Sequence, residues 1–83
     1  MNLNDKKIAI IGLGYVGLPL AVEFGKIYEV IGFDVKYPRV KQLSEGIDHT
    51  NECSPEEIKA ASKLSFSSDI EALRGCDIFI VTV

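Results

Sequence analysis

A glycine-rich run joins the first apolar segment of this chain to a helix-like segment. The run GLGYVG, residues 12–17, directly follows the apolar residues 8–11 and opens a helix-like segment at 16–26. A second strand-like run, residues 28–34, ends in Asp34. Glycines between a strand and a helix, with an acid about 20 residues further on, are typical of a dinucleotide-binding βαβ unit. The run therefore predicts that the chain folds around a nucleotide-binding turn.

Each glycine of this run has a physical role in such a turn. Gly12 allows the tight turn from strand to helix, Gly14 lets a pyrophosphate approach the backbone, and Gly17 lets the helix pack close to the sheet. The first N–H groups of the helix have no intrahelical partner, and the helix dipole adds about half a positive charge there. We therefore expect a diphosphate to bind without help from Lys or Arg.

Pro19 falls inside the segment that should be helical. In the first turn of a helix the missing N–H of proline would be unpaired anyway, so Pro19 marks the start of the helix. Gly17, Leu20, Ala21 and Phe24 recur at helical spacing and predict the face that packs on the sheet.

Asp34 predicts which dinucleotide is bound. A carboxylate at the end of the second strand accepts hydrogen bonds from the adenosine ribose hydroxyls and repels a 2′-phosphate, which favours NAD over NADP. Arg39 and Lys36 argue the other way, because a nearby arginine can accommodate a 2′-phosphate. We interpret Lys36 as a solvated surface charge.

The rest of the chain continues to alternate between helix and strand. Pro38–Glu45 predicts a short helix with Val40 and Leu43 inward and Gly46 as its end. Ser54-Pro55-Glu56-Glu57 predicts an N-cap, a proline at the first helical position and a capping box, in a helix that runs to about Ser62. The remaining predicted elements are a strand at 64–66, a short helix capped by Ser67 or Ser68 that runs through Leu73 to an end near Gly75, and a strand at 77–83.

These elements predict an α/β fold in the order β-α-β-α-α-β-α-β. Right-handed crossovers then give a partial Rossmann-type doubly wound parallel sheet of four strands, in the order 3-2-1-4. The strand at 77–83 is apolar without alternation, which predicts burial on both faces. We therefore expect residues 1–83 to be the N-terminal part of a larger NAD-binding domain. We also expect the edge of this last strand to pair with another copy in a homo-oligomer, or to be covered in another way.

Composition excludes several classes of function. The net charge is −3, so no basic field suggests nucleic acid or an anionic membrane surface as a partner. No apolar stretch approaches the roughly 20 residues that span a bilayer, and the first residues lack the pattern of a secretion signal, which favours a cytoplasmic protein. Cys53, in a polar loop, and Cys76, before the last strand, form no metal motif with His49. We expect Cys76 to be partly buried and find no base beside Cys53 that would make it a nucleophile.

The extended string KIAIIGLGYVGLPLA, residues 7–21, closely resembles the amino terminus of the nucleotide-sugar 6-dehydrogenases. These are the UDP-glucose and UDP-N-acetylhexosamine dehydrogenases, and the N-acetylhexosamine branch, including the Vi-polysaccharide type, is the most similar. The segment VIGFDV at 30–35, Arg39 and the closing DIFIVTV at 77–83 fit the same family. The resemblance covers nearly the whole chain, although the segment 36–38 departs from the polar stretch common in the family.

The resemblance implies positions for a bound NAD. It places Gly12, Leu13, Gly14, Tyr15, Val16 and Gly17 at the pyrophosphate turn, Asp34 at the adenosine ribose and Arg39 at the adenosine end. Thr82 and Val83 match the start of a segment on the nicotinamide side. Glu52 resembles a glutamate of the family loop that follows the second helix. No catalytic or metal-binding residue is implied within the chain.

The resemblance also implies a reaction for the full-length enzyme. The family oxidises the C6 alcohol of a UDP-sugar to a carboxylate with two NAD, in polysaccharide biosynthesis, and uses a catalytic cysteine and lysine that lie beyond Val83. We therefore expect the 83-residue chain to be inactive alone and to bind NAD weakly. Two alternatives remain: another β-hydroxyacid-type NAD dehydrogenase, and a non-catalytic nucleotide-sensing module of the same fold.

Overall fold

The computed structural model describes residues 5–82 and contains one parallel sheet with the strand order β3-β2-β1-β4. This is the predicted order 3-2-1-4, and the sequence of helices and strands is also the predicted one. The strands are β1 (Lys7–Ile11), β2 (Glu29–Phe33), β3 (Leu64–Ser67) and β4 (Ile78–Val81). The helices are α1 (Gly17–Gly25), α2 (Tyr37–Ser44), α3 (Pro55–Ala60) and the 3₁₀ helix η2 (Ile70–Leu73).

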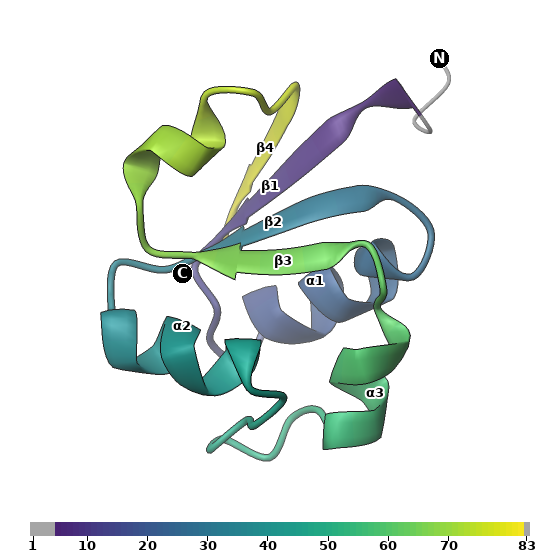
Figure 1. The fold of residues 1–83 in the computed structure, drawn as a ribbon, viewed down its shortest axis with the longest axis vertical. Coiled ribbons are helices and arrows are strands. Elements are labelled where there is room, and N and C mark those ends of the chain that lie inside the picture. The colour runs from purple at the N-terminus through teal and green to yellow at the C-terminus, as the bar shows by residue number, and fades with distance from the viewer. Residues whose placement is uncertain (1–4, 83) are drawn as a thin grey trace.

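The three α-helices lie together on one side of the sheet, and η2 lies on the other side (Figure 1). The register pairs Ile10 of β1 with Gly32 of β2 and with Ile80 of β4, so these positions form one row across the sheet. Ile8 and Ile10 of the central strand are at most 2% exposed and pack against the helix side. The core is therefore the space between the sheet and α1, α2 and α3.

Helix α1 packs on the sheet through a face that differs from the predicted one. Gly17 and Ala21 are buried as expected, but Leu18 and Val22 are the large side chains that are fully buried. Leu20 and Phe24 only pack against the margin of the core. The helix begins at Gly17, which places Pro19 in its first turn as predicted, and the inward face is turned by about one residue.

The capping of two helices tests local predictions. Ser54 caps α3 as predicted: its side chain accepts from the amide of Glu57, whose carboxylate accepts from the amide of Ser54. The predicted cap of the last short helix is wrong. Asp69, not Ser67 or Ser68, accepts from the amide of Glu71, while Ser67 Oγ accepts from the amide of Asp69.

The prediction that the last strand is buried on both faces is wrong within β4. Ile78 and Ile80 face the helix side and are partly buried, whereas Phe79 and Val81 are 52% and 67% exposed. The sequence of β4 is apolar on both faces, but among residues 5–82 only the helix-side residues of this strand pack against the core. No helix among residues 5–82 is long and apolar enough to cross a membrane.

Candidate functional site

The turn between β1 and α1 has a backbone conformation that favours glycine. Gly12 has φ +99°, a left-handed value that side chains rarely adopt, and its amide donates to the carbonyl of Phe33 at 2.8 Å. A Cβ at this position would lie 2.5 Å from the carbonyl oxygen of Thr82. Gly12 thus allows the chain to leave β1 between the ends of β2 and β4.

Gly17 and Gly14 face different surroundings. A Cβ on Gly17 would lie 1.7 Å from the carbonyl oxygen of Gly12 and 2.5 Å from Thr82 Oγ1. The first turn of α1 therefore packs directly on the glycine turn and the end of β4. A Cβ on Gly14 would meet nothing within 4 Å. The space above Gly14 is therefore open, which is what the approach of a pyrophosphate would require.

The backbone amides at the start of α1 are available to an anion. Val16, at the N-cap of α1, makes no side-chain capping bond, and no acidic residue lies in the first turn. The amides of Gly14, Tyr15 and Val16 donate to no acceptor among residues 5–82, and all three residues are exposed. Unpaired N–H groups at a helix N-terminus fit a diphosphate, since they provide both donors and positive potential.

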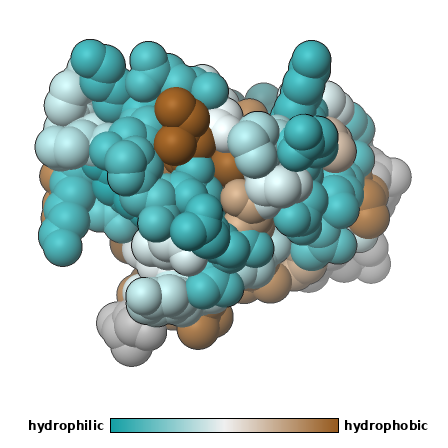
Figure 2. Space-filling view, turned by 90° about the horizontal axis from the view of Figure 1, so that it is seen from below, coloured by the Kyte–Doolittle hydropathy of each residue, from teal (hydrophilic) through white to brown (hydrophobic). Residues whose placement is uncertain are grey.

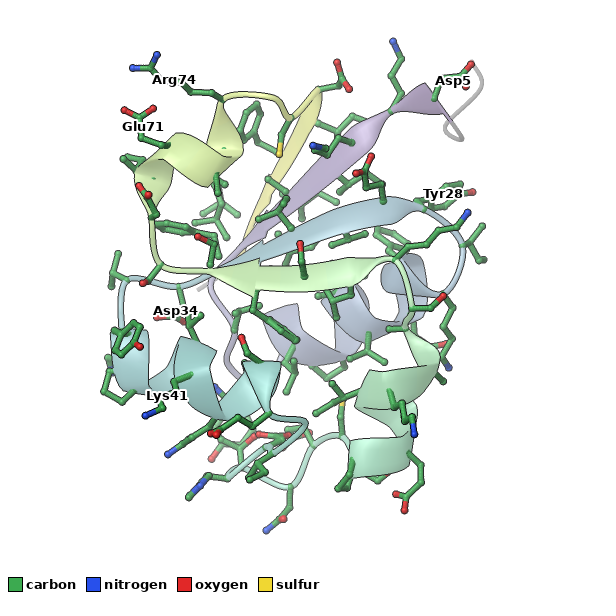
Figure 3. All side chains as sticks on the ribbon, in the orientation of Figure 1. Asp5, Tyr28, Asp34, Lys41, Glu71 and Arg74 are labelled. Atoms are coloured by element: carbon green, nitrogen blue, oxygen red, sulfur yellow. The ribbon has the colours of Figure 1, made fainter. Side chains whose placement is uncertain are left out.

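Asp34 follows the end of β2 and lies beside the start of α2 (Figure 3). Its Oδ2 accepts from the amide of Leu13 at 3.0 Å, and its Oδ1 accepts from the amide of Lys36 at 3.0 Å. An ionised carboxylate has about four acceptor positions, so two remain for the hydroxyls of a ribose. The first bond also ties the predicted ribose-binding residue directly to the glycine turn.

Arg39 lies in the first turns of α2 and reaches the same residue, Leu13, from the other side. Its Nε and Nη2 donate to the Leu13 carbonyl oxygen at 3.0 and 2.7 Å. Its Nη1 donates to Asp48 Oδ1 at 2.8 Å, in an ion pair whose side chains are 13% and 0% exposed. The prediction grouped Arg39 with the site, and the structure does place it against the glycine turn.

Asp48 is a residue of this site that the sequence interpretation missed. It lies in the loop between α2 and α3, and hydrogen bonds fix its carboxylate within that loop. Burial by itself would raise its pKa, but hydrogen bonds from Thr50, Arg39 and the amide of Cys53 outweigh burial and hold the pKa far below its usual range. The segment Asp48-His49-Thr50 offered one signal, because an aspartate that bonds the amide two residues later is a common turn pattern.

The other predicted site residues are distributed unevenly. Thr82 follows β4, and its Oγ1 donates to the Gly12 carbonyl oxygen at 2.8 Å, so it adjoins the turn. Val83 lies outside the described residues. Lys36 is exposed, as predicted, and Glu52 is exposed with its amide donating to Asp48 Oδ2 at 2.7 Å. The structure therefore brings together the residues from Gly12 to Gly17 with Asp34, Arg39 and Thr82.

The two cysteines take no part in this cluster. Cys53 lies in the loop between α2 and α3, as predicted, but its side chain is 6% exposed and packs in the core. Burial raises the pKa of both Cys53 and Cys76, which disfavours the reactive thiolate. No group of three His, Cys, Asp or Glu residues within 5–82 is arranged to hold a metal ion.

A separate cleft of about 640 Å³ lies between α2, α3 and β3. Its walls include Leu43, Ile58 and Phe66 but none of the glycine-turn residues. The surface seen from the helix side is mostly hydrophilic, with a hydrophobic spot facing the viewer and further hydrophobic atoms along the rim (Figure 2). The cleft shares no residue with the glycine turn, so it is separate from the candidate site at that turn.

Comparison with known proteins gives close matches over nearly the whole chain. It is 53% identical over 81 residues to UDP-N-acetyl-D-glucosamine 6-dehydrogenase of Pseudomonas aeruginosa, which covers 98% of this chain and 19% of the relative. It is 52% identical over 82 residues to the enzyme of the same name from Salmonella typhi, covering 99% of this chain and 19% of that enzyme. The chain thus spans about a fifth of the length of these relatives.

Solved structures agree with these sequence matches. The structure of UDP-D-ManNAc dehydrogenase from Pyrococcus horikoshii superposes with a TM-score of 0.79 at 33% identity, and the match covers 93% of this chain and 20% of that one. Residues 6–83 match the model of the UDP-glucose/GDP-mannose dehydrogenase family, NAD binding domain. With the fold and the glycine turn described above, these matches show that the chain belongs to the UDP-glucose/GDP-mannose dehydrogenase family, as its NAD binding domain.

Proposed function

We propose that the residues gathered at the glycine turn hold the adenosine diphosphate half of NAD. Leu13, Tyr15 and Val16 would lie along the pyrophosphate together with the three glycines, Asp34 would accept the ribose hydroxyls, and Arg39 would support the adenosine end. The observation that carries this proposal is the row of exposed, unpaired amides from Gly14 to Val16 above an open space. Thr82, which follows β4, would lie toward the nicotinamide, and we propose the same side for Val83 from the resemblance alone.

We also propose that residues 1–83 are the N-terminal part of an NAD-dependent UDP-sugar 6-dehydrogenase. Its full-length form would oxidise the C6 alcohol of a UDP-N-acetylhexosamine, or of UDP-glucose, to a carboxylate for polysaccharide biosynthesis. The two bacterial relatives described above support the N-acetylhexosamine substrate through their names and identities. The 83-residue chain should not oxidise UDP-sugars by itself, because neither of its cysteines matches the catalytic cysteine of the family and burial raises the pKa of both thiols.

The partners and location follow as lesser proposals. The outer face of β4 exposes Phe79 and Val81, and among the described strands β4 pairs only with β1. We propose that the free edge of β4 pairs with a second copy when nothing else covers it. The unpaired N–H and C=O groups of an open strand edge are a template for such pairing. Both cysteines are free thiols, which fits a cytoplasmic protein.

A nuclear magnetic resonance titration of the ¹⁵N-labelled 83-residue chain with NAD, NADP and ADP tests the site. NAD and ADP should shift the amide signals of Gly14, Tyr15 and Val16 with similar affinities of about millimolar, because only the adenosine half is held. NADP should bind more weakly. Tight NADP binding, or NAD-induced shifts confined to the cleft between α2, α3 and β3, would contradict the proposed site.

A Gly14→Ala variant provides a matched test of the pyrophosphate position. A Cβ there enters open space in the free protein, so the amide spectrum should stay close to that of wild type. The same Cβ would occupy the path of the pyrophosphate, so NAD binding should weaken by about tenfold or more. Unchanged NAD affinity in a folded Gly14→Ala protein would mean that the diphosphate lies elsewhere.

A further inference from the structure

Asp48 is the one buried side chain within 5–82 that is polar or charged. Its carboxylate accepts five hydrogen bonds at 2.6 to 2.9 Å, from the amides of Thr50, Glu52 and Cys53, from Thr50 Oγ1 and from Arg39 Nη1. Four of these bonds come from the loop itself and hold the carboxylate still. The fifth connects this fixed anion to α2.

The guanidinium of Arg39 is therefore held at both ends. Asp48 takes one arm of the planar group, while Nε and the other arm converge on the Leu13 carbonyl oxygen. Because a guanidinium is rigid and planar, fixing Nη1 determines where Nε and Nη2 point. The carboxylate of Asp48 thus aims Arg39 at the glycine turn.

Both backbone polar groups of Leu13 are consequently held by hydrogen bonds to side chains. Its amide donates to Asp34 Oδ2, and its carbonyl accepts the two bonds from Arg39. The peptide that follows Leu13 carries the amide of Gly14, the first of the three exposed amides. The hydrogen bonds to Asp34 and from Arg39 thus fix the orientation of the peptide that leads into Gly14.

The pairing also changes what Arg39 offers to an anion. An arginine soon after the ribose-binding acid is the residue type that accommodates a 2′-phosphate. Here three of its five N–H donors are already used, and its charge is matched by a carboxylate 2.8 Å away in a nearly buried pair. A 2′-phosphate would therefore meet a guanidinium whose charge is paired and most of whose donors are used, and it would lie beside the carboxylate of Asp34.

We propose that Asp48 is a positioning and specificity-determining residue, which commits Arg39 to the Leu13 carbonyl and so prevents it from receiving a 2′-phosphate. The role in specificity rests on the proposed NAD site. The role in positioning does not, because it concerns the geometry of the free protein.

The test compares the wild-type 83-residue chain with Asp48→Asn, Arg39→Lys and the control Glu56→Gln. Asparagine turns one acceptor into a donor, so it cannot accept from the loop amides and from Arg39 together. Glu56→Gln makes the same change in charge at an exposed position of α3. The readouts are the Arg39 Nε–Hε signal, the Gly14 amide signal and the affinities for NAD and NADP.

In wild type and Glu56→Gln the Hε signal should be sharp and protected from exchange with water. In Asp48→Asn it should exchange at least about tenfold faster, and the NADP-to-NAD affinity ratio should rise about tenfold, the scale of one charge-assisted hydrogen bond. Arg39→Lys should move the Gly14 amide signal, because a lysine lacks the planar fork. It should not raise the NADP-to-NAD ratio, because Asp48 still neutralises the charge.

Retained Hε protection in folded Asp48→Asn would overturn the positioning role. Lost protection with an unchanged NADP-to-NAD ratio would overturn the specificity role alone. If the amide spectrum shows that Asp48→Asn is unfolded, Arg39→Lys decides: an unmoved Gly14 signal overturns the proposal. If wild type binds neither nucleotide, the proposed function and the specificity role both fail, while the Hε signal still decides the positioning role.

Discussion

The inner strands β1 and β2 differ from the edge strand β4 in how completely they are covered. On the helix side of β1 and β2, Ile8, Ile10 and Val30 are at most 2% exposed beneath α1, α2 and α3. In β4 only the helix-side residues are partly buried, and Phe79 and Val81 are more than half exposed. The glycine turn, at the end of β1, lies where the two regions meet, because Thr82 after β4 donates to the Gly12 carbonyl oxygen.

This difference separates the two halves of a dinucleotide site. The hydrogen bonds of Leu13 and Asp34 that involve side chains join the turn after β1, the end of β2 and the start of α2, next to the covered part of the sheet. Thr82, the one described residue proposed for the nicotinamide side, follows the partly exposed strand β4. The proposed adenosine half of the site is thus held next to the covered part of the sheet, while the proposed nicotinamide side adjoins the partly exposed strand β4.

The largest expected effect comes from closing the glycine turn sterically. Gly17→Ala would place a Cβ 1.7 Å from the backbone of Gly12, which no side-chain adjustment can relieve. We expect a loss of at least about 4 kcal/mol in the free energy of unfolding, enough to unfold much of so small a domain. Gly14→Ala, with no neighbour within 4 Å, should change it by less than about 0.5 kcal/mol.

Urea denaturation of both glycine variants, followed by circular dichroism, gives the measurement. Equal stability of the two variants would show that the turn can relax around a new side chain. The glycine turn, and with it the proposed adenosine half of the site, would then be less rigid than its contacts indicate.

A second prediction compares truncations on the covered and uncovered parts of the sheet. Ile10 is fully buried, so Ile10→Ala should cost about 3 kcal/mol from lost burial and an unfilled cavity. Phe79 is 52% exposed on the outer face, so Phe79→Ala should cost less than about 1 kcal/mol. Thermal unfolding at low protein concentration measures both. A cost at Phe79 that matches Ile10 would mean that a layer covers β4 in solution, and sedimentation would show whether a second copy supplies it.

Some parts of this structure follow from residue type alone. The glycine turn is predictable because only glycine readily adopts the φ of Gly12 and fits the close contact at Gly17. Asp34 is predictable because the parallel strands β1 and β2 end at the same edge of the sheet, which places the acid after β2 beside the turn after β1. The capping box at Ser54 is equally local. Each of these features depends on a few neighbouring residues.

Other parts depend on contacts that the sequence does not display. The inward face of α1 includes Leu18 and Val22 because the helix starts at Gly17, and a small rotation exchanges one set of apolar residues for another. The exposure of Phe79 depends on what lies over β4, which its own residues cannot specify. Asp48 was missed because its importance arises from a bond to Arg39, nine residues earlier.

The third prediction concerns pH and the loop that braces the turn. The pKa of Asp48 is held far below its usual range, so its ionised form stabilises the folded state. That contribution is complete above the unfolded pKa of about 4 and is lost as pH falls below it. At pH 7, Asp48→Asn should lower the free energy of unfolding by about 2 kcal/mol, since it leaves buried amides poorly paired.

The difference between wild type and Asp48→Asn should shrink from pH 4 downward, because protonated aspartate resembles asparagine. Urea unfolding of both proteins at pH 7, 4 and 3 measures the trend and cancels the titration of the other carboxylates. A difference that stays constant across this range would mean that the ionised carboxylate does not stabilise the loop.

The smallest effects should come from two helix caps on opposite sides of the sheet. Ser54 caps α3, which buries Ile58 in the core, so Ser54→Ala should cost about 1 kcal/mol. Asp69 makes a similar bond at the start of η2, but η2 buries no residue, so Asp69→Ala should cost only a few tenths of a kcal/mol. The reason is that a cap stabilises the whole fold only as far as its helix is coupled to the core. Denaturation curves of the two variants measure both costs, and an equal loss at both sites would show that η2 is as firmly coupled to the sheet as the helix layer.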